Sequence, residues 1–209
     1  TVQDLAAQWV GLLSAPQPGQ LILDACAGVG GKTTHLAELI RGQATIHAAD
    51  RASTKLQRLL ETAARLGVRD SIEPIVVDLA ESSDGLAEHY DLIVIDAPCT
   101  GVGVLRRHPE LKWRPGACDS GELEKTQQAM LARLAPRVRP GGALVYAVCS
   151  FKAEEGPAQI ERFLAAHEDF EVDASSTRVP LARDPKGYLR TWPHLDDADA
   201  FFAVRLRRS

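Results

Sequence analysis

Short apolar runs alternate with segments of helical periodicity along the whole chain, and this alternation constrains the fold more than any other feature. The runs with the character of buried strands are residues 21–23, 45–49, 75–77, 92–95 and 143–148. They are almost continuously apolar, as parallel strands covered on both faces should be. Helical spacing fills the intervals, for example from an expected cap at Ser53 to a stop at Gly67. The pattern predicts an α/β fold with a doubly wound, mostly parallel open sheet.

Details of the pattern predict the strand order. Pro74 lies inside the third strand pattern and cannot donate a ladder hydrogen bond, which favours an edge position. The order 3-2-1-4-5 places that strand at the edge, and residues 201–206 have the character of a last strand added late in the chain. A helix around residues 130–134 is expected to end near Pro140.

The composition is that of one folded domain, because 209 residues with 45% apolar and 25% charged side chains can bury a sizeable core. The four cysteines, at positions 26, 99, 118 and 149, form no CxxC pair, which excludes a zinc ribbon and a dense disulfide framework. Reduced thiols in the cytoplasm are therefore expected. No apolar stretch reaches the roughly 20 residues of a membrane span. The six histidines include no HExxH motif, so no metal site is expected.

Charge excludes one broad class of function. The chain has 24 Lys and Arg against 28 Asp and Glu, a net charge of −4, which argues against a protein that coats nucleic acid through bulk charge. A local basic surface is an alternative that the net charge does not exclude. We expect the protein to be a monomer. The chain begins at Thr1 and has no secretory signal pattern, so we expect a single domain over residues 1–209 that is a fragment of a longer protein.

A glycine-rich segment follows the first strand. Asp24 leads into residues 26–32, where glycines stand at 28, 30 and 31 immediately before a helix. Such a loop lets backbone N–H groups and the positive end of the helix approach a ligand closely, and predicts a cofactor site. Two nucleotide motifs match only in part. A phosphate loop needs glycine where Cys26 stands, and GxGxxG meets Thr33 where its third glycine belongs.

Acidic residues follow the second and third strands. Asp50 can accept from both ribose hydroxyls and Asp78 from an adenine amino group, which suits a nucleoside ligand without phosphates. S-adenosylmethionine fits, because its cationic sulfonium is favoured by carboxylates that would repel a pyrophosphate. The alternative interpretation is that these acids are helix caps and solvated strand ends. The expected cofactor contacts are Cys26, Ala27, Gly28, Val29, Gly30, Gly31, Lys32, Asp50, Asp78 and Asp96.

Two cysteines follow neighbouring strands. Cys99 stands three residues after Asp96 at the mouth of the fourth strand, and Cys149 ends the fifth. Adjacent parallel strands are about 4.8 Å apart, so two thiols at their carboxyl ends can face one pocket. A buried free cysteine is commonly a small hydrophobic residue, an interpretation that suits Cys118 or Cys26.

These segments resemble the motifs of the RNA cytosine-5 methyltransferases, and the similarity to the bacterial ribosomal small-subunit group (Sun/Fmu-type) runs through nearly the whole chain. The resembling segments are DACAGVGGKT at 24–33, DAPCTG at 96–101, RRHP at 106–109 with KW at 112–113, and VCS at 148–150. This chain departs from the family's usual residues at Gly28-Val29, where Ala-Pro is usual, and at Ala200, where glycine is usual. The resemblance implies the seven-stranded, Rossmann-like sheet of the class I S-adenosylmethionine-dependent methyltransferases. It also implies an N-terminal helical RNA-binding domain that this chain lacks.

The resemblance further implies methylation of carbon 5 of a cytosine in RNA, with 16S ribosomal RNA as the first candidate. Carbon 5 is a weak nucleophile until a thiolate adds at carbon 6. Cys149 is the implied nucleophile, Cys99 the residue that assists product release, and Asp96 the group that holds the base near N3 and its amino group. Lys32 lies close enough to the strand ends to lower a thiol pKa, although an exposed lysine at a helix start is an alternative.

Residues 100–121 and 175–200 are long irregular stretches and are expected to be functional loops. The first carries a basic and aromatic group next to the predicted pocket, able to hold phosphates and stack on a flipped base. Its members are Arg106, Arg107, His108, Lys112, Trp113 and Arg114. The residues that could extend this track are Arg183, Lys186, Arg190, Arg205, Arg207 and Arg208. Because the net charge is negative, we expect weak and salt-sensitive RNA binding.

Three other functions stay open from the sequence. A transfer RNA cytosine-5 methyltransferase shares the same chemistry. A dinucleotide oxidoreductase could use the same sheet, although the broken GxGxxG and the lack of a hydride-transfer residue count against it. An RNA-binding module that has lost catalysis is disfavoured by the intact pair Cys99 and Cys149.

Overall fold

The computed structural model of the chain describes residues 1–113, 119–175, 179 and 184–209. Three residues discussed above, Arg114, Cys118 and Arg183, lie outside these ranges. The strands are β1 Leu21–Asp24, β2 Thr45–Asp50, β3 Ile72–Val76, β4 Tyr90–Asp96, β5 Val138–Val148, β6 Phe170–Val172, β7 Leu189–Arg190 and β8 Phe202–Arg208. The α-helices are α1 Leu5–Ser14, α2 Gly31–Leu39, α3 Ser53–Arg65, α4 Gly121–Leu134, α5 Pro157–Ala166 and α6 Pro193–Asp196. Short 3₁₀ helices are η1 Arg69–Ser71, η2 Val102–Val104, η3 Pro109–Trp113 and η4 Ala135–Arg137.

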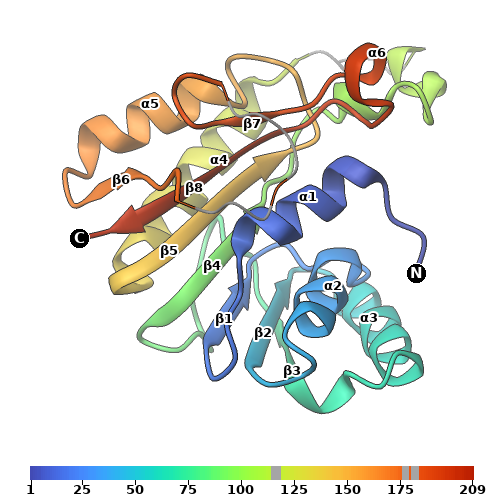
Figure 1. Cartoon of the computed structure of the whole chain (residues 1–209), viewed down its shortest axis with the longest axis vertical. Coiled ribbons are helices and arrows are strands. Elements are labelled where there is room, and N and C mark those ends of the chain that lie inside the picture. Colours follow the sequence, from blue (N-terminus) through green and yellow to red (C-terminus); the bar gives the residue numbers. More distant parts are fainter. Residues whose placement is uncertain (114–118, 176–178, 180–183) are drawn as a thin grey trace.

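The strands form one sheet in the order β3-β2-β1-β4-β5-β8-β6, and β7 pairs with β8 outside this path. The pairs from β3 to β5 are parallel, whereas β8 runs antiparallel to both β5 and β6. This confirms the doubly wound, mostly parallel sheet and the order 3-2-1-4-5. It also confirms the late strand, which inserts next to β5 and carries β6 at the far edge (Figure 1).

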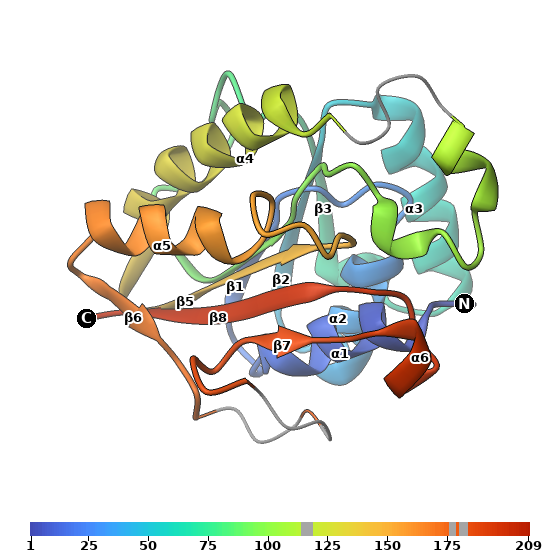
Figure 2. The ribbon, with the colours of Figure 1, turned by 90° about the horizontal axis from the view of Figure 1, so that it is seen from above.

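Helices cover the sheet on both faces, so the strands are buried on two sides. Helices α1, α2 and α3 lie against one face, and α4 and α5 against the other (Figure 2). Alternate residues of β4 serve the two layers: Leu92 and Val94 pack with the first group, Ile93 and Ile95 with the second. This two-sided burial is the reason why the strand segments are apolar without alternation.

The third strand is an edge strand, as Pro74 predicts, but it runs over Ile72–Val76 rather than 75–77. Asp78 therefore lies two residues beyond its strand instead of ending it. The β-sheet tolerates Pro74 because one side of an edge strand needs no ladder donor.

Two predicted helix boundaries are wrong. Ser53 is the first residue of α3 rather than its cap, and the N-cap Ala52 donates its N–H to the Asp50 carboxylate at 2.8 Å. The α4 helix ends at Leu134, well before Pro140, which lies inside β5. Pro136 accounts for the earlier stop of the α-helix, because proline lacks the N–H that would continue the α-helical hydrogen bonds, and the chain continues as the 3₁₀ helix η4 over Ala135–Arg137.

Candidate active site

The carboxyl ends of β1, β2, β4 and β5 meet at one edge of the sheet. Backbone hydrogen bonds continue the pairing just past the strands: Ala25 N–H donates to Val94 at 2.8 Å, and Ala97 N–H to Ala147 at 2.9 Å. The residues that follow each strand are therefore held in register next to one another. This register brings the glycine loop, Asp96 and Cys149 to one place.

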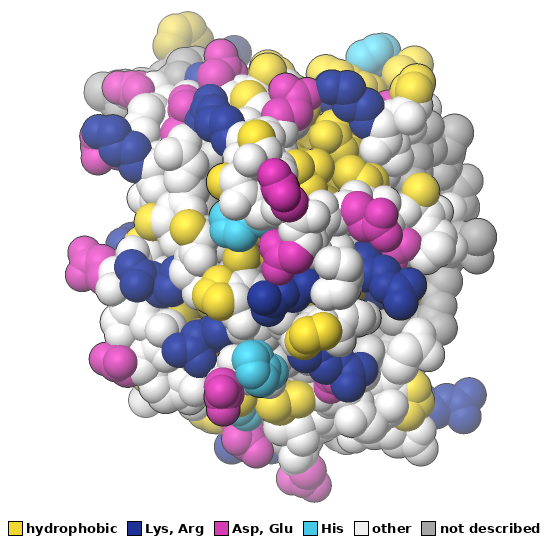
Figure 3. Space-filling model, turned by 90° about the vertical axis from the view of Figure 1, so that its left-hand side faces the viewer, with side chains coloured by type: hydrophobic (Ala, Val, Ile, Leu, Met, Phe, Trp, Pro, Cys, Tyr) yellow, Lys and Arg dark blue, Asp and Glu magenta, His cyan; other side chains and the backbone are white. Residues whose placement is uncertain are grey.

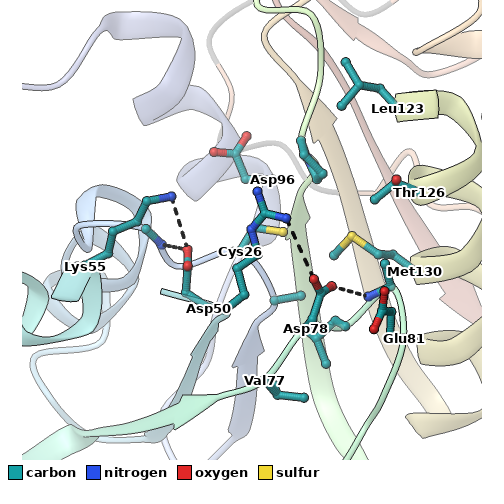
Figure 4. A pocket seen from close by; sticks show the side chains of 16 residues that line it. Cys26, Asp50, Lys55, Val77, Asp78, Glu81, Asp96, Leu123, Thr126 and Met130 are labelled. Atoms are coloured by element: carbon teal, nitrogen blue, oxygen red, sulfur yellow. Dashed lines mark hydrogen bonds and ion pairs between the residues drawn. The ribbon is translucent and has the colours of Figure 1, made fainter. Parts of the chain in front are cut away.

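A cavity of about 440 Å³ opens at this edge, a size typical of small-ligand sites. Figure 4 shows that its walls come from the strand ends on one side and from α4, with Leu123, Thr126 and Met130, on the other. The predicted cofactor residues that line it are Cys26, Gly28, Asp50, Asp78 and Asp96. The cavity combines carboxylates with apolar surface, which is what a nucleoside requires.

The glycine loop has the backbone that its composition predicts. Gly28 and Gly30 have φ angles of +55° and +91°, in the left-handed region that favours glycine. A Cβ atom on Gly30 would stand 2.6 Å from Cγ of Leu59, so the loop packs closely against α3. Val29, the residue that departs from the family's proline, is 53% exposed and lies outside the cavity lining.

Asp50 and Asp78 reach the cavity from neighbouring strands, and each is oriented by the backbone. Asp50 accepts from the Gly28 N–H at 3.0 Å, which ties the end of β2 to the glycine loop, and its carboxylate lies 3.8 Å from the ammonium of Lys55. Asp78 accepts from the Ala80 N–H at 3.1 Å and faces Arg51 at 3.8 Å. Figure 4 shows both carboxylates with these partners. Because a carboxylate has about four lone-pair sites, each retains acceptor capacity for a ligand.

Lys32 is a half-buried member of the site and not an exposed lysine. Its Nζ donates to Asp96 Oδ2 at 2.5 Å, with its side chain only 11% exposed. Burial opposes the charge of Lys32, but the carboxylate of Asp96 outweighs it and raises the lysine pKa. The ammonium also lies 5.4 Å from the ring centroid of Phe201, a cation–π contact. A charged hydrogen-bonding pair thus stands where β4 ends.

The two predicted catalytic thiols converge. Cys99 Sγ and Cys149 Sγ are 3.3 Å apart, and both residues are half-buried. The hydrogen bond between the two sulfurs is the main cause that raises the pKa of Cys99 well above its ordinary value, with burial adding to it. Cys99 therefore holds its proton more tightly than an ordinary cysteine.

Buried polar contacts hold the loops that carry these thiols. Glu155, fully buried, accepts from both the N–H and the hydroxyl of Thr100 at 2.7 Å, next to Cys99. Gly103 donates its N–H to the carbonyl of Cys149 at 3.0 Å. The loop after β4 is thus tied to the segment after β5 at two points shortly after Cys99.

Asp24 and Cys26 lie at the end of β1; Asp24 is buried and Cys26 is half-buried. Burial raises the pKa of Cys26 well above its ordinary value, and the carboxylates of Asp96, Asp24 and Asp50 raise it further. Burial likewise raises the pKa of Asp24 to about 6, although the Thr33 hydroxyl donates to it at 2.7 Å. Cys26 is therefore a neutral thiol in the cavity wall and not a nucleophile.

The basic loop is only partly available to a nucleic acid. Arg106 forms ion pairs with Asp4 at 3.0 Å, with Asp197 at 2.9 Å and with Asp199 at 3.0 Å, and Arg107 also binds Asp199. Carboxylates of the same chain therefore pair with both guanidinium groups, and the expectation that this loop holds RNA phosphates stays a prediction. Lys112 and Trp113 differ: Trp113 is 79% exposed, with the lysine 5.1 Å from its ring centroid.

Four of the cations expected to extend the basic track are also paired with carboxylates. Lys186 binds Glu161, Arg190 binds Asp184, Arg205 binds Asp173, and Arg208 binds Asp169, at 2.6 to 3.3 Å. Figure 3 shows one face of the molecule, where basic and acidic side chains are interspersed. That face therefore has no uniform basic field, and the ion pairs accord with the net negative charge of the chain.

Sequence reasoning missed the second wall of the cavity and the supports of the thiol loops. Leu123, Thr126 and Met130 line the cavity from α4, and Gln127 donates to the carbonyl of Pro98 at 2.9 Å. These residues look like an ordinary amphipathic helix, and only the packing of α4 over the strand ends shows their place. No local sequence pattern indicated that Lys32 pairs with Asp96. None indicated that Glu155 holds the loop of Cys99.

Within the residues that the structure describes, no cluster of three or more histidine, cysteine or acidic side chains could hold a metal ion. Over the same ranges, no helix has the length and apolar character needed to cross a membrane.

The doubly wound sheet, the glycine loop, the strand-end acids and the cavity that they share define a Rossmann-like domain of the class I methyltransferase type. Residues 11–207 match the family described as 16S rRNA methyltransferase RsmB/F. This chain belongs to that family.

Named relatives agree with this assignment. The chain is 41% identical over 213 residues to the probable ribosomal RNA small subunit methyltransferase B of Synechocystis sp., covering 100% of this chain and 48% of that protein. It is 39% identical to ribosomal RNA small subunit methyltransferase B of Pasteurella multocida, covering 100% and 47%. The solved structure of NSun6 from Pyrococcus horikoshii with SFG has a TM-score of 0.87 at 27% identity, covering 99% of this chain and 52% of that one. The chain thus spans about half the length of the curated relatives it matches.

Proposed function

We propose that this chain is the catalytic domain of an S-adenosylmethionine-dependent RNA methyltransferase that acts on carbon 5 of a cytosine, with 16S ribosomal RNA as the substrate. The names of the family and of its relatives support ribosomal RNA. The observation that carries the chemistry is the pair of thiols 3.3 Å apart, next to the Lys32–Asp96 pair. In this proposal, RNA selection is shared with a part of the protein outside the 209 residues.

The residues present fit S-adenosylmethionine. Asp50 keeps acceptor capacity for ribose hydroxyls, and Asp78 stands at the next strand to accept from an adenine amino group. Apolar wall residues such as Leu79 and Met130 suit the faces of the base. A Cβ atom added at Gly28 would meet only the Cys26 carbonyl oxygen, at 3.9 Å, so the backbone at this position is open to a ligand. When bound, this cofactor supplies a methyl group on a cationic sulfur.

The two thiols have different roles in the covalent reaction. Cys149, as the thiolate, forms a bond to carbon 6 of a flipped cytosine, and the ring becomes an enamine that is nucleophilic at carbon 5. In this proposal the Asp96 carboxylate accepts from the amino group of the base, and the ammonium of Lys32, its partner, stabilises the negative charge that develops on the ring after addition. Such a pair is effective because it is already oriented before the reaction starts.

Release of the product requires loss of the proton from carbon 5 and breakage of the Cys149 bond to carbon 6. Once Cys149 is bonded to carbon, it no longer competes with Cys99 for a proton. The largest cause of the raised Cys99 pKa then disappears, so Cys99 loses its proton more readily and is available as the thiolate that accepts the proton from carbon 5. The contact between the two sulfurs places both thiols within reach of one substrate carbon, which supports the division into a nucleophile and a release residue in this proposal.

The test is methyl transfer from labelled S-adenosylmethionine to 16S ribosomal RNA, with the labelled base identified by nucleoside analysis. We expect 5-methylcytidine from the parent and no transfer from Cys149→Ala. For Cys99→Ala we expect an RNA adduct that survives denaturation, because addition proceeds and elimination does not. The matched control is the double variant Cys99→Ala/Cys149→Ala, which should form no adduct. Label on another base, or an adduct in the double variant, would reject the proposal.

A further inference from the structure

Cys99 and Cys149 are a candidate site for a second kind of chemistry, because two thiols in contact can be oxidised together. Their sulfurs are 3.3 Å apart, and a disulfide bond requires about 2.05 Å. An approach of little more than 1 Å, which side-chain rotation supplies, would join them. In the part of the chain that the structure describes, Cys26 is the other cysteine, and it is free as well.

The backbone already holds Cys99 and Cys149 next to each other. Asp96 and Ala147 are in register across β4 and β5, three and two residues before the respective cysteines. Beyond the strands, Gly103 N–H to the Cys149 carbonyl and Glu155 to Thr100 hold the two segments together. Neither segment has to unfold for the sulfurs to meet. Both cysteines are half-buried rather than sealed, so a small oxidant can reach them.

We propose that Cys99 and Cys149 form a reversible intramolecular disulfide when the protein meets a peroxide. The Cys149 thiolate attacks a peroxide oxygen, the O–O bond breaks, and the products are a sulfenic acid and water. The Cys99 thiol then attacks that sulfur, the S–OH bond breaks, and a second water leaves. Overall, two thiols lose two electrons and two protons, and one hydrogen peroxide is reduced to two waters.

Oxidation at this site has two consequences. It removes both groups that the proposed methyl transfer uses, a consequence that rests on the proposed function. It also protects Cys149, because a sulfenic acid captured by a neighbouring thiol does not proceed to the irreversible sulfinic acid. Disulfide formation itself rests only on the geometry and does not depend on what the protein methylates.

The experiment treats the 209-residue chain with hydrogen peroxide, blocks the remaining thiols under denaturing conditions and maps the peptides by mass spectrometry. We expect the free thiols to fall from four to two, with one linked peptide pair that contains residues 99 and 149, and full recovery of the thiols with dithiothreitol. Methyl transfer should fall at least about tenfold on oxidation and return on reduction.

Two variants sharpen the result. Cys26→Ser should retain the 99–149 link, whereas Cys99→Ser should form none, and its Cys149 should proceed to the sulfinic acid that dithiothreitol does not reverse. Four thiols that persist in peroxide, a different linked pair, or a sulfinic Cys149 beside a free Cys99 in the parent would overturn the proposal. A 99–149 disulfide in a protein that methylates no RNA would overturn the proposed function and leave the disulfide standing.

Discussion

Asp24 shows how one residue of this site opposes stability. Its carboxyl group is fully buried, one of its oxygens has no hydrogen-bond partner, and burial raises its pKa from 3.8 to about 6. The unfolded chain loses this proton from about pH 4, whereas the folded chain keeps it to about pH 6. Stability is therefore lost as the pH rises through this window, and the full penalty is present above pH 6.

Asp24→Asn should stabilise the protein in neutral solution, because the amide is uncharged and its oxygen still accepts from the Thr33 hydroxyl. From the shift of 3.8 to about 6, we expect a gain on the order of 3 kcal/mol at pH 8, and roughly half of that at pH 5. Urea unfolding at the two pH values measures both. Asp84→Asn, at an exposed position, is the matched control and should change neither value. A variant that is less stable than the parent, by the same amount at both pH values, would contradict this account.

Glu155 acts through Cys99 and not on the substrate, since its carboxylate accepts both hydrogen bonds of Thr100. Glu155→Ala leaves these donors without an acceptor and should cost about 1–3 kcal/mol of stability. It should also release the loop of Cys99, so that the RNA adduct accumulates while S-adenosylmethionine binding stays unchanged. Adduct yield on denaturing gels and calorimetry of cofactor binding measure the two effects. Glu155→Gln, which keeps one acceptor oxygen, should restore part of the lost stability. Weaker cofactor binding without an RNA adduct in Glu155→Ala would show that Glu155 has only a general structural role.

At the level of elements, the short η2 helix is the junction on which both thiol segments depend. A Cβ atom on Gly103 would stand 1.9 Å from the Ala200 carbonyl oxygen and 2.8 Å from that of Cys149. Only glycine lets η2 lie this close to the segments before β8 and after β5. This close packing explains why residue 103 is a glycine although η2 does not line the cavity.

Gly103→Ala should therefore destabilise the protein by about 1–3 kcal/mol, because the backbone of one of the three segments must move. We also expect lower methyl transfer and a lower yield of the 99–149 disulfide, since Cys149 moves with its carbonyl. Thermal unfolding and thiol mapping measure these effects. Gly121→Ala is the control: its added Cβ would meet Asp119 Oδ1 at 3.5 Å, an ordinary contact, and the change should be close to neutral. Equal behaviour of the two variants would exclude the packing argument.

At the scale of the whole molecule, long-range ion pairs join the two ends of the chain to the loop after β4. Asp4 caps α1 through the Ala6 N–H, accepts from the Asp199 N–H and binds Arg106, which also binds Asp199. Asp199 is fully buried, so this cluster of Asp4, Arg106, Arg107 and Asp199 is a structural junction. Residues that look like an RNA-binding group in the sequence thus hold the termini against the site.

Cofactor binding should stabilise the whole domain, because the walls of the cavity come from different parts of the chain. At a ligand concentration 100 times Kd, S-adenosylmethionine should add about 2.7 kcal/mol, which corresponds to a rise in Tm of roughly 5–10 °C for a chain of this size. NAD at the same concentration should give no shift, because its pyrophosphate meets the carboxylates. Asp50→Ala should abolish the shift and should also lower the apo Tm, because the N–H groups of Gly28 and Ala52 lose their acceptor. A Tm shift with NAD and none with S-adenosylmethionine would contradict the proposed cofactor and favour the dinucleotide oxidoreductase.

Much of the site was predictable because the positions that matter follow strands. The glycine loop, Asp50, Asp96, Cys99 and Cys149 are visible as residues next to apolar runs, and parallel topology places such residues at one edge. Asp78 was predicted at a strand end and lies two residues past it, which shows that element boundaries are less certain than element order. The supports of the site were not visible, since a buried glutamate or an amphipathic helix has no local signature of its role.

The sheet, its strand order and the edge that carries the site could be predicted from the residues alone, because apolar periodicity and strand-end position are local properties. Which charges meet could not be predicted, because it depends on the folded chain. Lys32 and Asp96 are 64 residues apart in the chain, Arg106 and Asp199 are 93 apart, and Asp4 and Asp199 are 195 apart. The free energy of such a pair depends on the distance and burial of both groups, and these quantities exist only once the chain has folded.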